Sequence, residues 1–294
     1  MSNLSKPRLW LAAIKPPMYS VAIMPILVGT AIAYSQTHTL DLGVLLDFLL
    51  AGILILAWEN LCNDLFDADT GIDLHKAHSV VNLTGKKALV QLVANLCLLA
   101  GLGAIAGIAW QQQDLTVVGL ILLCCALGYV YQGPPFRWGY QGWGELLCFV
   151  SFGPVALSAA YYSQVQAFSG LAIAASPVVG VATSLILYCS HFNQVTDDQK
   201  AGKRSPVVQL GTQRAASLLP WICAGIYGVV LAGIGLGYFP AATALSLLGI
   251  PIAFKLCTEV MAHHDQEQRL ASCRFIAVGL HFCTCLGFGL GFIL

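Results

Sequence analysis

The chain alternates between long apolar runs and short segments of polar and turn-forming residues, such as Gln111-Gln112-Gln113-Asp114. A run of about 20 apolar residues is long enough to cross the hydrocarbon core of a bilayer as an α-helix. We therefore predict an all-α membrane protein with nine transmembrane helices. The predicted helices cover residues 17–36, 43–65, 87–110, 115–132, 142–163, 170–193, 217–236, 239–260 and 272–293.

The composition agrees with a membrane-embedded chain. Of the 294 residues, 57% are hydrophobic and only 10% are charged, whereas a soluble domain carries about 25% charged residues. We expect residues 1–294 to form a single transmembrane domain with the lipid bilayer as its surroundings. The net charge of zero argues against a nucleic-acid partner. Nearly all of the 11 cysteines fall inside apolar runs without zinc-ligand spacing, which favours small buried residues.

The basic residues are confined to one side of the predicted bundle. If the loops alternate across the membrane, the N-terminus and every second loop contain all the lysines and arginines: Lys6, Arg8, Lys15, Lys76, Lys86, Lys87, Arg137, Lys200, Lys203, Arg204, Arg214, Lys255, Arg269 and Arg274. Because cytoplasmic loops are enriched in Lys and Arg, we predict a cytoplasmic N-terminus and a C-terminus on the opposite side. The membrane would be a plasma or a thylakoid membrane.

Most acidic residues lie on the same side, and the first acidic group follows the second predicted helix. If that helix continues beyond residue 65, then Asn60, Asn63, Asp64 and Asp67 share one face, because they are three or four residues apart. Clustered carboxylates repel one another near hydrocarbon, and a cation would relieve that repulsion. Oxygen-only ligands favour Mg²⁺. The alternative is an acidic loop that is simply solvated.

A second acidic group follows the sixth predicted helix and repeats the pattern of the first. At an offset of 130 residues, Asn193 corresponds to Asn63 and Asp197 corresponds to Asp67. This echo predicts a parallel internal repeat that presents two acidic sites to one cavity. Basic residues stand beside both groups: Lys76, Lys200, Lys203 and Arg204. Carboxylates mixed with cations suit a magnesium-bound diphosphate, although the cations could also be topological anchors.

These motifs resemble those of the UbiA-type intramembrane aromatic prenyltransferases. Asn63-Asp64-Leu65-Phe66-Asp67 matches the NDxxD motif of that family, with Asp73 near its downstream acidic position. The stretch from Tyr131 to Glu145 (YQGPPFRWGYQGWGE) is similar to the branch that prenylates 1,4-dihydroxy-2-naphthoate. Residues 191–206 most resemble the cyanobacterial and plastid members, which attach a phytyl chain on the way to phylloquinone. The second motif departs from the family's DxxxD, because Gln194 stands at its first position when Asp198 takes the second.

The resemblance implies a nine-helix bundle and an Mg²⁺-dependent transfer of a phytyl group from phytyl diphosphate to 1,4-dihydroxy-2-naphthoate. The prenyl group would replace the carboxylate and give demethylphylloquinol. One Mg²⁺ would bind Asp64 and Asp67 with Asn60 or Asn63. The other would bind Asp197 and Asp198 with Asn193, and these two aspartates could divide the role between them. Candidates for the diphosphate or the naphthoate carboxylate are Lys203, Arg204 and Arg137.

Several interpretations stay open at this stage. Tyr131 could face the allylic cation or be an interfacial aromatic, and Arg137 could be a topological anchor. Glu59 and Glu145 could be structural partners of Lys or Arg, or could act as a general base. The donor could be a longer polyprenyl diphosphate, as in menaquinone synthesis. A secondary transporter is the alternative from another class, but the scarcity of ionisable residues in the outer half disfavours it.

Overall fold

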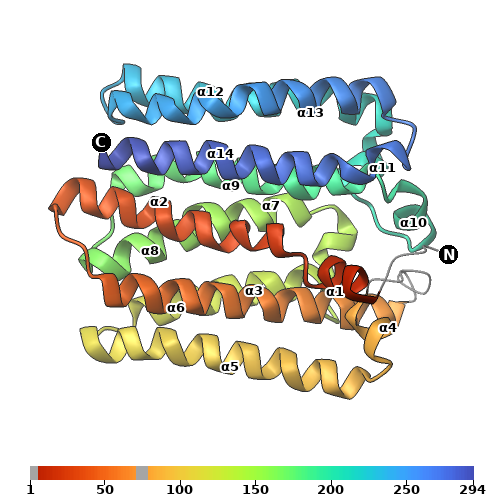
Figure 1. The fold of residues 1–294 in the computed structure, drawn as a ribbon, viewed down its shortest axis with the longest axis horizontal. Helices are drawn as coiled ribbons and strands as arrows, with labels where there is room; N and C mark the ends of the chain where they lie inside the picture. Colours follow the sequence, from red (N-terminus) through yellow and green to blue (C-terminus); the bar gives the residue numbers. More distant parts are fainter. Residues whose placement is uncertain (1–5, 71–78) are drawn as a thin grey trace.

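A computed structural model describes residues 6–70 and 79–294, and these residues form a bundle of roughly parallel helices (Figure 1). Asp73, His75, Lys76 and His78 lie outside the described residues. The first half of the chain forms α1 (Lys6–Ile14), η1 (Pro16–Tyr19), α2 (Ser20–Thr37), α3 (Leu42–Thr70), α4 (Val80–Thr84), α5 (Lys87–Gln112) and α6 (Thr116–Gln132). The others are η2 (Trp138–Gln141), α7 (Gly144–Val150), η3 (Ser151–Val155), α8 (Ala156–Val165), α9 (Gly170–His191), α10 (Val195–Lys200), α11 (Pro206–Leu210), α12 (Thr212–Gly235), η4 (Ala241–Gly249), α13 (Ile250–His263), η5 (Arg269–Ser272) and α14 (Cys273–Ile293).

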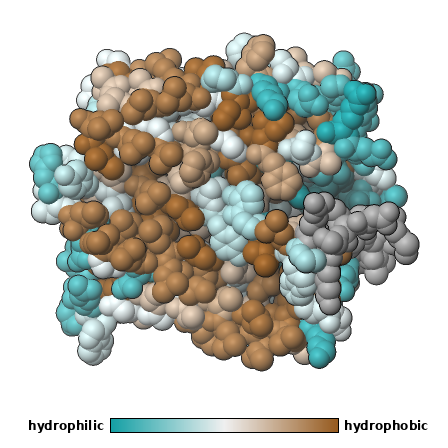
Figure 2. All heavy atoms as spheres, viewed as in Figure 1, coloured by the Kyte–Doolittle hydropathy of each residue, from teal (hydrophilic) through white to brown (hydrophobic). Residues whose placement is uncertain are grey.

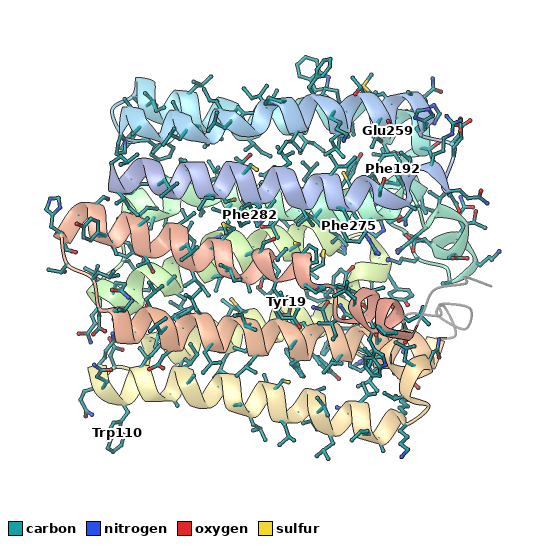
Figure 3. All side chains as sticks on the ribbon, viewed as in Figure 1. Tyr19, Trp110, Phe192, Glu259, Phe275 and Phe282 are labelled. Carbon is teal, nitrogen blue, oxygen red and sulfur yellow. The ribbon has the colours of Figure 1, made fainter. Side chains whose placement is uncertain are left out.

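The prediction of an all-α membrane protein is confirmed. Within the described residues, eight helical segments are long and apolar enough to cross a membrane, and α6 is a shorter apolar helix of 17 residues. Together these nine segments lie at the nine predicted positions. Figure 2 shows hydrophobic residues over the middle of the bundle and hydrophilic residues gathered at its two ends. At one of these ends Trp110 points outward from α5 (Figure 3), as aromatic residues do at a membrane–water interface.

The boundaries differ from the prediction where polar or irregular backbone continues a helix. Helix α3 runs to Thr70 rather than to residue 65, so the first acidic group is helical. The predicted helix over 142–163 is interrupted, because α7 and α8 are joined by the π-helical turn η3, which contains Pro154. Proline cannot donate the regular helical hydrogen bond, and such π-helical turns occur often at functional sites.

The bundle has two hydrophobic cores. One core gathers residues of α2, α9, α12, α13 and α14, and the other gathers residues of α3, α5 and α6. In Figure 1, α5 lies at one edge of the bundle and α12 with α13 at the other, while α2, α9 and α14 lie between them. Side chains on the outer face of α5, such as Leu92 and Leu99, are exposed, as expected for a surface that contacts lipid.

The internal echo in the sequence has a structural counterpart. After each acidic group comes a buried serine, Ser79 or Ser205, and then a five-residue helix, α4 or α11. Each short helix is followed by a glycine with positive φ, Gly85 or Gly211, before the next long helix. Glycine adopts this left-handed conformation without steric penalty. Both acidic groups, together with α1, lie at the same end of the bundle, and Leu294 lies at the opposite end (Figure 1).

Candidate active site

A cavity of about 550 Å³ opens between the two halves of the bundle at this acidic end. Its walls come from η1, α3, α6, α7, η3, α9, α10 and the start of α14. The residues predicted for the site line this cavity with the exception of Arg137 and Arg204: Asn60, Asn63, Asp64, Asp67, Tyr131, Asn193, Asp197, Asp198 and Lys203. The fold thus brings two groups that are 130 residues apart in sequence to one cavity.

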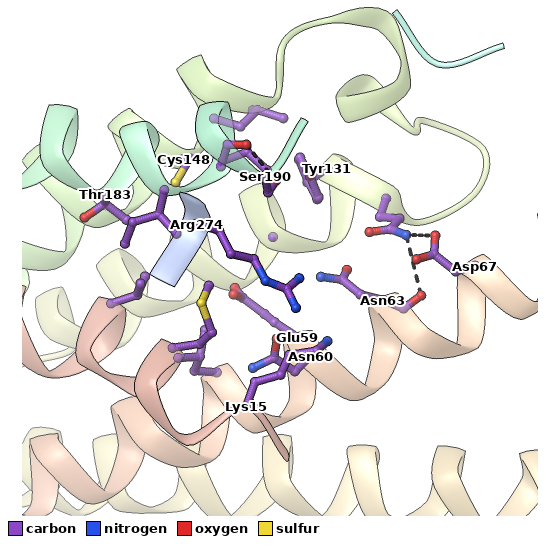
Figure 4. Close-up of a pocket in the computed structure, with 18 of the residues that line it drawn as sticks. Lys15, Glu59, Asn60, Asn63, Asp67, Tyr131, Cys148, Thr183, Ser190 and Arg274 are labelled. Carbon is purple, nitrogen blue, oxygen red and sulfur yellow. Dashed lines mark hydrogen bonds between the residues drawn. The ribbon is translucent and has the colours of Figure 1, made fainter. Parts of the chain in front are cut away.

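On the first wall, Asp67 is held by residues of α6 and of the loop after it. The Gln132 amide donates a hydrogen bond to Asp67 Oδ1, as Figure 4 shows. The Tyr140 hydroxyl lies 3.4 Å from the same oxygen. Because α3 stays helical, Asn63 and Asp67 lie one turn apart and both face the cavity, as the spacing predicted.

Asp64 is the buried member of the first pair, with an exposed fraction of 2%. Its Oδ2 accepts a hydrogen bond from the Val80 amide at 2.8 Å, and it therefore caps the N-terminus of α4. Its Oδ1 lies 3.7 Å from Lys15 Nζ. Lys15 occupies the left-handed turn between α1 and η1, immediately before Pro16, and this turn brings it to the cavity.

On the second wall, Asp198 is the buried member, with an exposed fraction of 1%. Its Oδ2 lies 3.0 Å from His191 Nδ1, and its Oδ1 lies 3.3 Å from Lys203 Nζ. Burial alone would raise the pKa of Asp198, but the hydrogen bond with His191 and the charges of Lys203 and His191 outweigh burial and hold the pKa below its usual value. The neighbouring Asp197 is exposed and lines the cavity.

His191 also joins Asp198 to Glu145. Its Nε2 lies 3.3 Å from Glu145 Oε1 on α7, so the imidazole is placed between two carboxylates and is itself 2% exposed. The sequence suggested a lysine or an arginine as the structural partner of Glu145, and the structure gives it a histidine instead. This arrangement fixes α7, the end of α9 and α10 relative to one another.

Tyr131 lies on α6, and glycines allow its ring to pack closely. A Cβ atom at Gly139 would lie 2.7 Å from the Tyr131 ring, and one at Gly144 would lie 2.9 Å from it. Such distances exclude any larger residue without displacement of the ring. The same loop contacts the second acidic segment, because the Arg204 amide donates to the Tyr140 carbonyl at 2.7 Å. Gly139 and Gly144 are therefore explained by packing against the Tyr131 ring.

Three polar residues of the cavity wall were not among the site residues predicted from the sequence. Gln132 contacts Asp67, Glu59 lies deeper along α3, and Arg274 enters from α14 (Figure 4). Glu59 and Arg274 lie inside predicted membrane spans, and a charge in such a span is itself a signal of function. From the sequence, Arg274 was instead interpreted as one of the basic residues on the N-terminal side of the bundle, because it lies so near the start of its helix.

The donors at the two acidic walls suit a hard divalent cation. Among the described residues, no three His, Cys, Asp or Glu side chains are grouped so that they could hold a metal ion by themselves. Mg²⁺ is usually bound by one or two carboxylates, with water and substrate phosphate as its remaining ligands. Asn193, which lines the same cavity as Asp197, has an Oδ1 that is buried without a hydrogen-bond partner, and this is an oxygen of the kind that Mg²⁺ binds.

Comparison with known proteins shows the family to which the chain belongs. A family model described as the UbiA prenyltransferase family matches residues 22–278, and the chain therefore belongs to that family. It is accordingly a membrane-embedded prenyltransferase. The chain is 50% identical over 275 residues to the 2-carboxy-1,4-naphthoquinone phytyltransferase of Synechocystis sp., covering 94% of this chain and 90% of that protein.

A plant relative and a solved structure extend this comparison. The chloroplastic 2-carboxy-1,4-naphthoquinone phytyltransferase of Arabidopsis thaliana is 38% identical over 294 residues, covering 96% of this chain and 76% of that protein. The fold is similar to that of a UbiA homologue from Archaeoglobus fulgidus bound to DMAPP and Mg²⁺. The TM-score is 0.62 at 17% identity, with 94% of this chain and 99% of the other covered.

Proposed function

We propose that the protein transfers a phytyl group from phytyl diphosphate to 1,4-dihydroxy-2-naphthoate and releases CO₂ and diphosphate. The main support for this proposal is the cavity. Its two acidic walls, with lysines beside them, face an interior lined by Leu56, Phe152 and other apolar residues. The names and similarity of the Synechocystis and Arabidopsis relatives support this donor and this acceptor. We further infer that residues 1–294 act as one transmembrane domain.

The acidic walls would hold Mg²⁺ bound to the diphosphate. Asp64 and Asp67, with Asn60 or Asn63, would bind one ion, and a second would bind the residues of the other wall: Asn193, Asp197 and Asp198. When bound, Mg²⁺ neutralises the charge that develops on the departing diphosphate. Asp67 and Asp197 are less buried than Asp64 and Asp198, so they are the carboxylates that a ligand in the cavity reaches first. Lys203 and Lys15 are placed to bind the outer phosphate oxygens.

The cavity would also protect the allylic cation. Apolar side chains such as Met18, Leu56 and Phe152 exclude water, which would otherwise capture the cation before the aromatic ring does. The Tyr131 ring, held by Gly139 and Gly144, can stabilise positive charge through its π-face. Arg137 and Arg204 do not line the cavity, so we give them no direct contact with either substrate.

The orientation follows from the same surface. The acidic end of the bundle also carries α1, Lys15 and Lys203, so we propose that it faces the cytoplasm, with Leu294 at the opposite face of the membrane. The diphosphate and the naphthoate, which are both charged, would then enter from the cytoplasmic side.

The direct test is product analysis with purified protein in detergent. We expect incubation with 1,4-dihydroxy-2-naphthoate, Mg²⁺ and phytyl diphosphate under anaerobic conditions to yield demethylphylloquinol by mass spectrometry. We expect octaprenyl diphosphate to give at least 10-fold less product. A preference for octaprenyl diphosphate would shift the assignment to menaquinone synthesis. The enzymatic proposal fails if neither donor is consumed by protein that remains folded and monodisperse.

A further inference from the structure

Arg274 places a cation inside the cavity without a protein counter-ion. It is the second residue of α14, and its side chain reaches into the cavity toward Asn63 and Glu59 (Figure 4). Its Nε is buried without a hydrogen-bond partner. No ion pair joins it to a carboxylate in the described part of the chain. It makes a cation–π contact with Phe275, in which the guanidinium carbon lies 4.8 Å from the centre of the ring.

An arginine in this position carries a cost for the folded protein, because its side chain is partly buried and its Nε has no hydrogen-bond partner. Guanidinium remains charged under all ordinary conditions, and a buried charge is destabilising unless it is paired and hydrogen-bonded. Lys15 and Lys203, the other cations of the cavity, each have an aspartate within 3.7 Å. Arg274 therefore differs from them: it points toward Glu59 without forming an ion pair with it, and we infer that its partner is an anionic group of a ligand.

The depth of Arg274 distinguishes it from Asp67 and Asp197. Cys273, which precedes it, donates a hydrogen bond from Sγ to the Cys189 carbonyl at 2.9 Å. The start of α14 is thus level with Cys189 on α9, whereas Asp197 lies beyond the end of that helix. In Figure 4, Asp67 likewise lies farther along α3 than Asn63 and Glu59, toward which Arg274 points. Arg274 is consequently deeper in the bundle than Asp67 and Asp197, the accessible carboxylates that would hold the metal ions.

We propose that Arg274 binds the carboxylate of the aromatic acceptor and so orients the ring for attack, a proposal that rests on the function given above. The planar guanidinium fork matches a carboxylate through two parallel hydrogen bonds. The ring carbon that carries the carboxylate forms the new bond to the allylic carbon. That allylic carbon loses its bond to oxygen, and the diphosphate leaves with the electron pair. The carboxylate is bonded directly to the reacting carbon, and Arg274, which enters the cavity at a deeper level than Asp67 and Asp197, is placed to bind it.

The rest of the reaction balances without another reactant. After the new carbon–carbon bond forms, the bond from the ring to the carboxylate breaks, and its electron pair restores the aromatic ring. The carboxylate leaves as CO₂, which is uncharged. The ion pair with Arg274 is then lost together with the substrate's charge, so the interaction orients the acceptor but does not retain the product. Arg274 would accordingly favour a carboxylated acceptor over the same ring without a carboxylate.

The test compares two acceptors and three variants. Binding of 1,4-dihydroxy-2-naphthoate and of 1,4-dihydroxynaphthalene is measured by titration calorimetry in detergent, with Mg²⁺ and the unreactive donor phytyl thiolodiphosphate present. For Arg274→Gln we expect the affinity for the naphthoate to fall by about 10- to 150-fold, the range for loss of a hydrogen bond to a charged group. We expect unchanged affinity for the carboxylate-free diol and for the donor. Arg274→Lys should lose less affinity for the naphthoate than Arg274→Gln does, because lysine keeps the positive charge.

The matched control is Arg269→Gln, which removes an exposed arginine five residues earlier. It should leave all three affinities unchanged. If Arg274→Gln lowers the affinity for the donor and leaves the affinity for the naphthoate unchanged, Arg274 binds the diphosphate and the proposal is overturned. Equal losses for the naphthoate and the diol would also overturn it. If Arg274→Gln does not fold, a wild-type affinity for the naphthoate in Arg274→Lys would contradict it. Failure of the wild type to prenylate the naphthoate would instead refute the proposed function.

Discussion

At the scale of single residues, each acidic wall combines one buried carboxylate with one that is more accessible. Asp64 and Asp198 are buried, and each is bound by a lysine and by a second group of the fold. Asp67 and Asp197 have greater access to the cavity. Identical side chains therefore have different physical settings, because the burial of each is decided by the segments that pack over it. We interpret the buried pair as ligands that also hold the walls in place.

Asp198 gives this interpretation a measurable pH dependence. Its pKa in the folded protein lies below the usual 3.8, so ionised Asp198 stabilises the fold fully above pH 3.8 and loses this contribution as the pH falls through the lowered value. In metal-free buffer at pH 7, we expect Asp198→Asn to unfold at a temperature roughly 5 °C or more below the wild type, because His191 and Lys203 lose their partner. The measurement is tryptophan fluorescence during heating.

The same comparison at acid pH provides the control. Near pH 3.5 the difference between the wild type and Asp198→Asn should become smaller, because Asp198 takes up a proton more readily in the unfolded chain, where its pKa is 3.8, than in the folded protein. A difference of the same size at pH 3.5 and pH 7 would show that the substitution acts through packing rather than through charge.

At the scale of elements, the connection between α6 and α7 builds one side of the cavity. It carries Tyr140 to Asp67 and packs Gly139 and Gly144 against Tyr131. The π-helical turn η3 then places Ser151 and Phe152 in the wall. Irregular backbone is tolerated at membrane depth only where it is buried in protein or lines a cavity. The cavity thus explains why this region departs from a regular helix.

Gly144→Ala tests the connection without a change in any charged group. Its Cβ would lie 2.9 Å from the Tyr131 ring and 3.3 Å from Leu187, so the ring must move. We expect kcat to fall by about 10- to 100-fold, because small misplacements near a reacting centre have effects of that size. Steady-state kinetics with saturating donor and acceptor measure this change.

The control for this substitution is Gly119→Ala on α6, where an added Cβ meets no atom within 4 Å. It should leave kcat unchanged, and alanine should slightly favour the helix. If Gly144→Ala has the kcat of the wild type, the packing of the Tyr131 ring against Gly144 is not required for catalysis.

At the scale of the whole molecule, the cavity lies where the two halves of the chain meet. Each half contributes an acidic segment, a short helix and a glycine with positive φ, and the two hydrophobic cores lie on either side of the cavity. Neither half could form the site alone. A metal-bound diphosphate between the walls would join the halves through their carboxylates, which makes the shared cavity the central feature of the protein.

The sequence predicted the helices well because the spans are set by a physical length. The predicted 170–193 and 115–132 agree closely with Gly170–His191 and Thr116–Gln132. Hydropathy did not reveal the π-helical turn at Pro154 or the extension of α3 to Thr70, since both depend on local hydrogen bonding. It also placed the start of α12 at residue 217, because the polar first turn from Thr212 resembles a loop.

The site was predictable only as far as its motifs extend. Spacing along one helix placed Asn60, Asn63 and Asp67 together, and the echo indicated a second wall. Contacts between helices, such as Gln132 with Asp67, depend on which faces meet, and one sequence does not specify this. Arg137 and Arg204 lie outside the cavity lining for the same reason, since a basic residue near a motif need not point into the cavity.

The most direct test of the shared cavity is metal binding in the presence of phytyl thiolodiphosphate. With Mn²⁺ in place of Mg²⁺, electron paramagnetic resonance of the detergent-purified protein should count a pair of bound ions that require the diphosphate. Asp67→Asn and Asp197→Asn, on opposite walls, should each lose one ion and weaken donor binding. Unchanged Mn²⁺ binding in both variants, or Mn²⁺ binding that is independent of the diphosphate, would contradict the account.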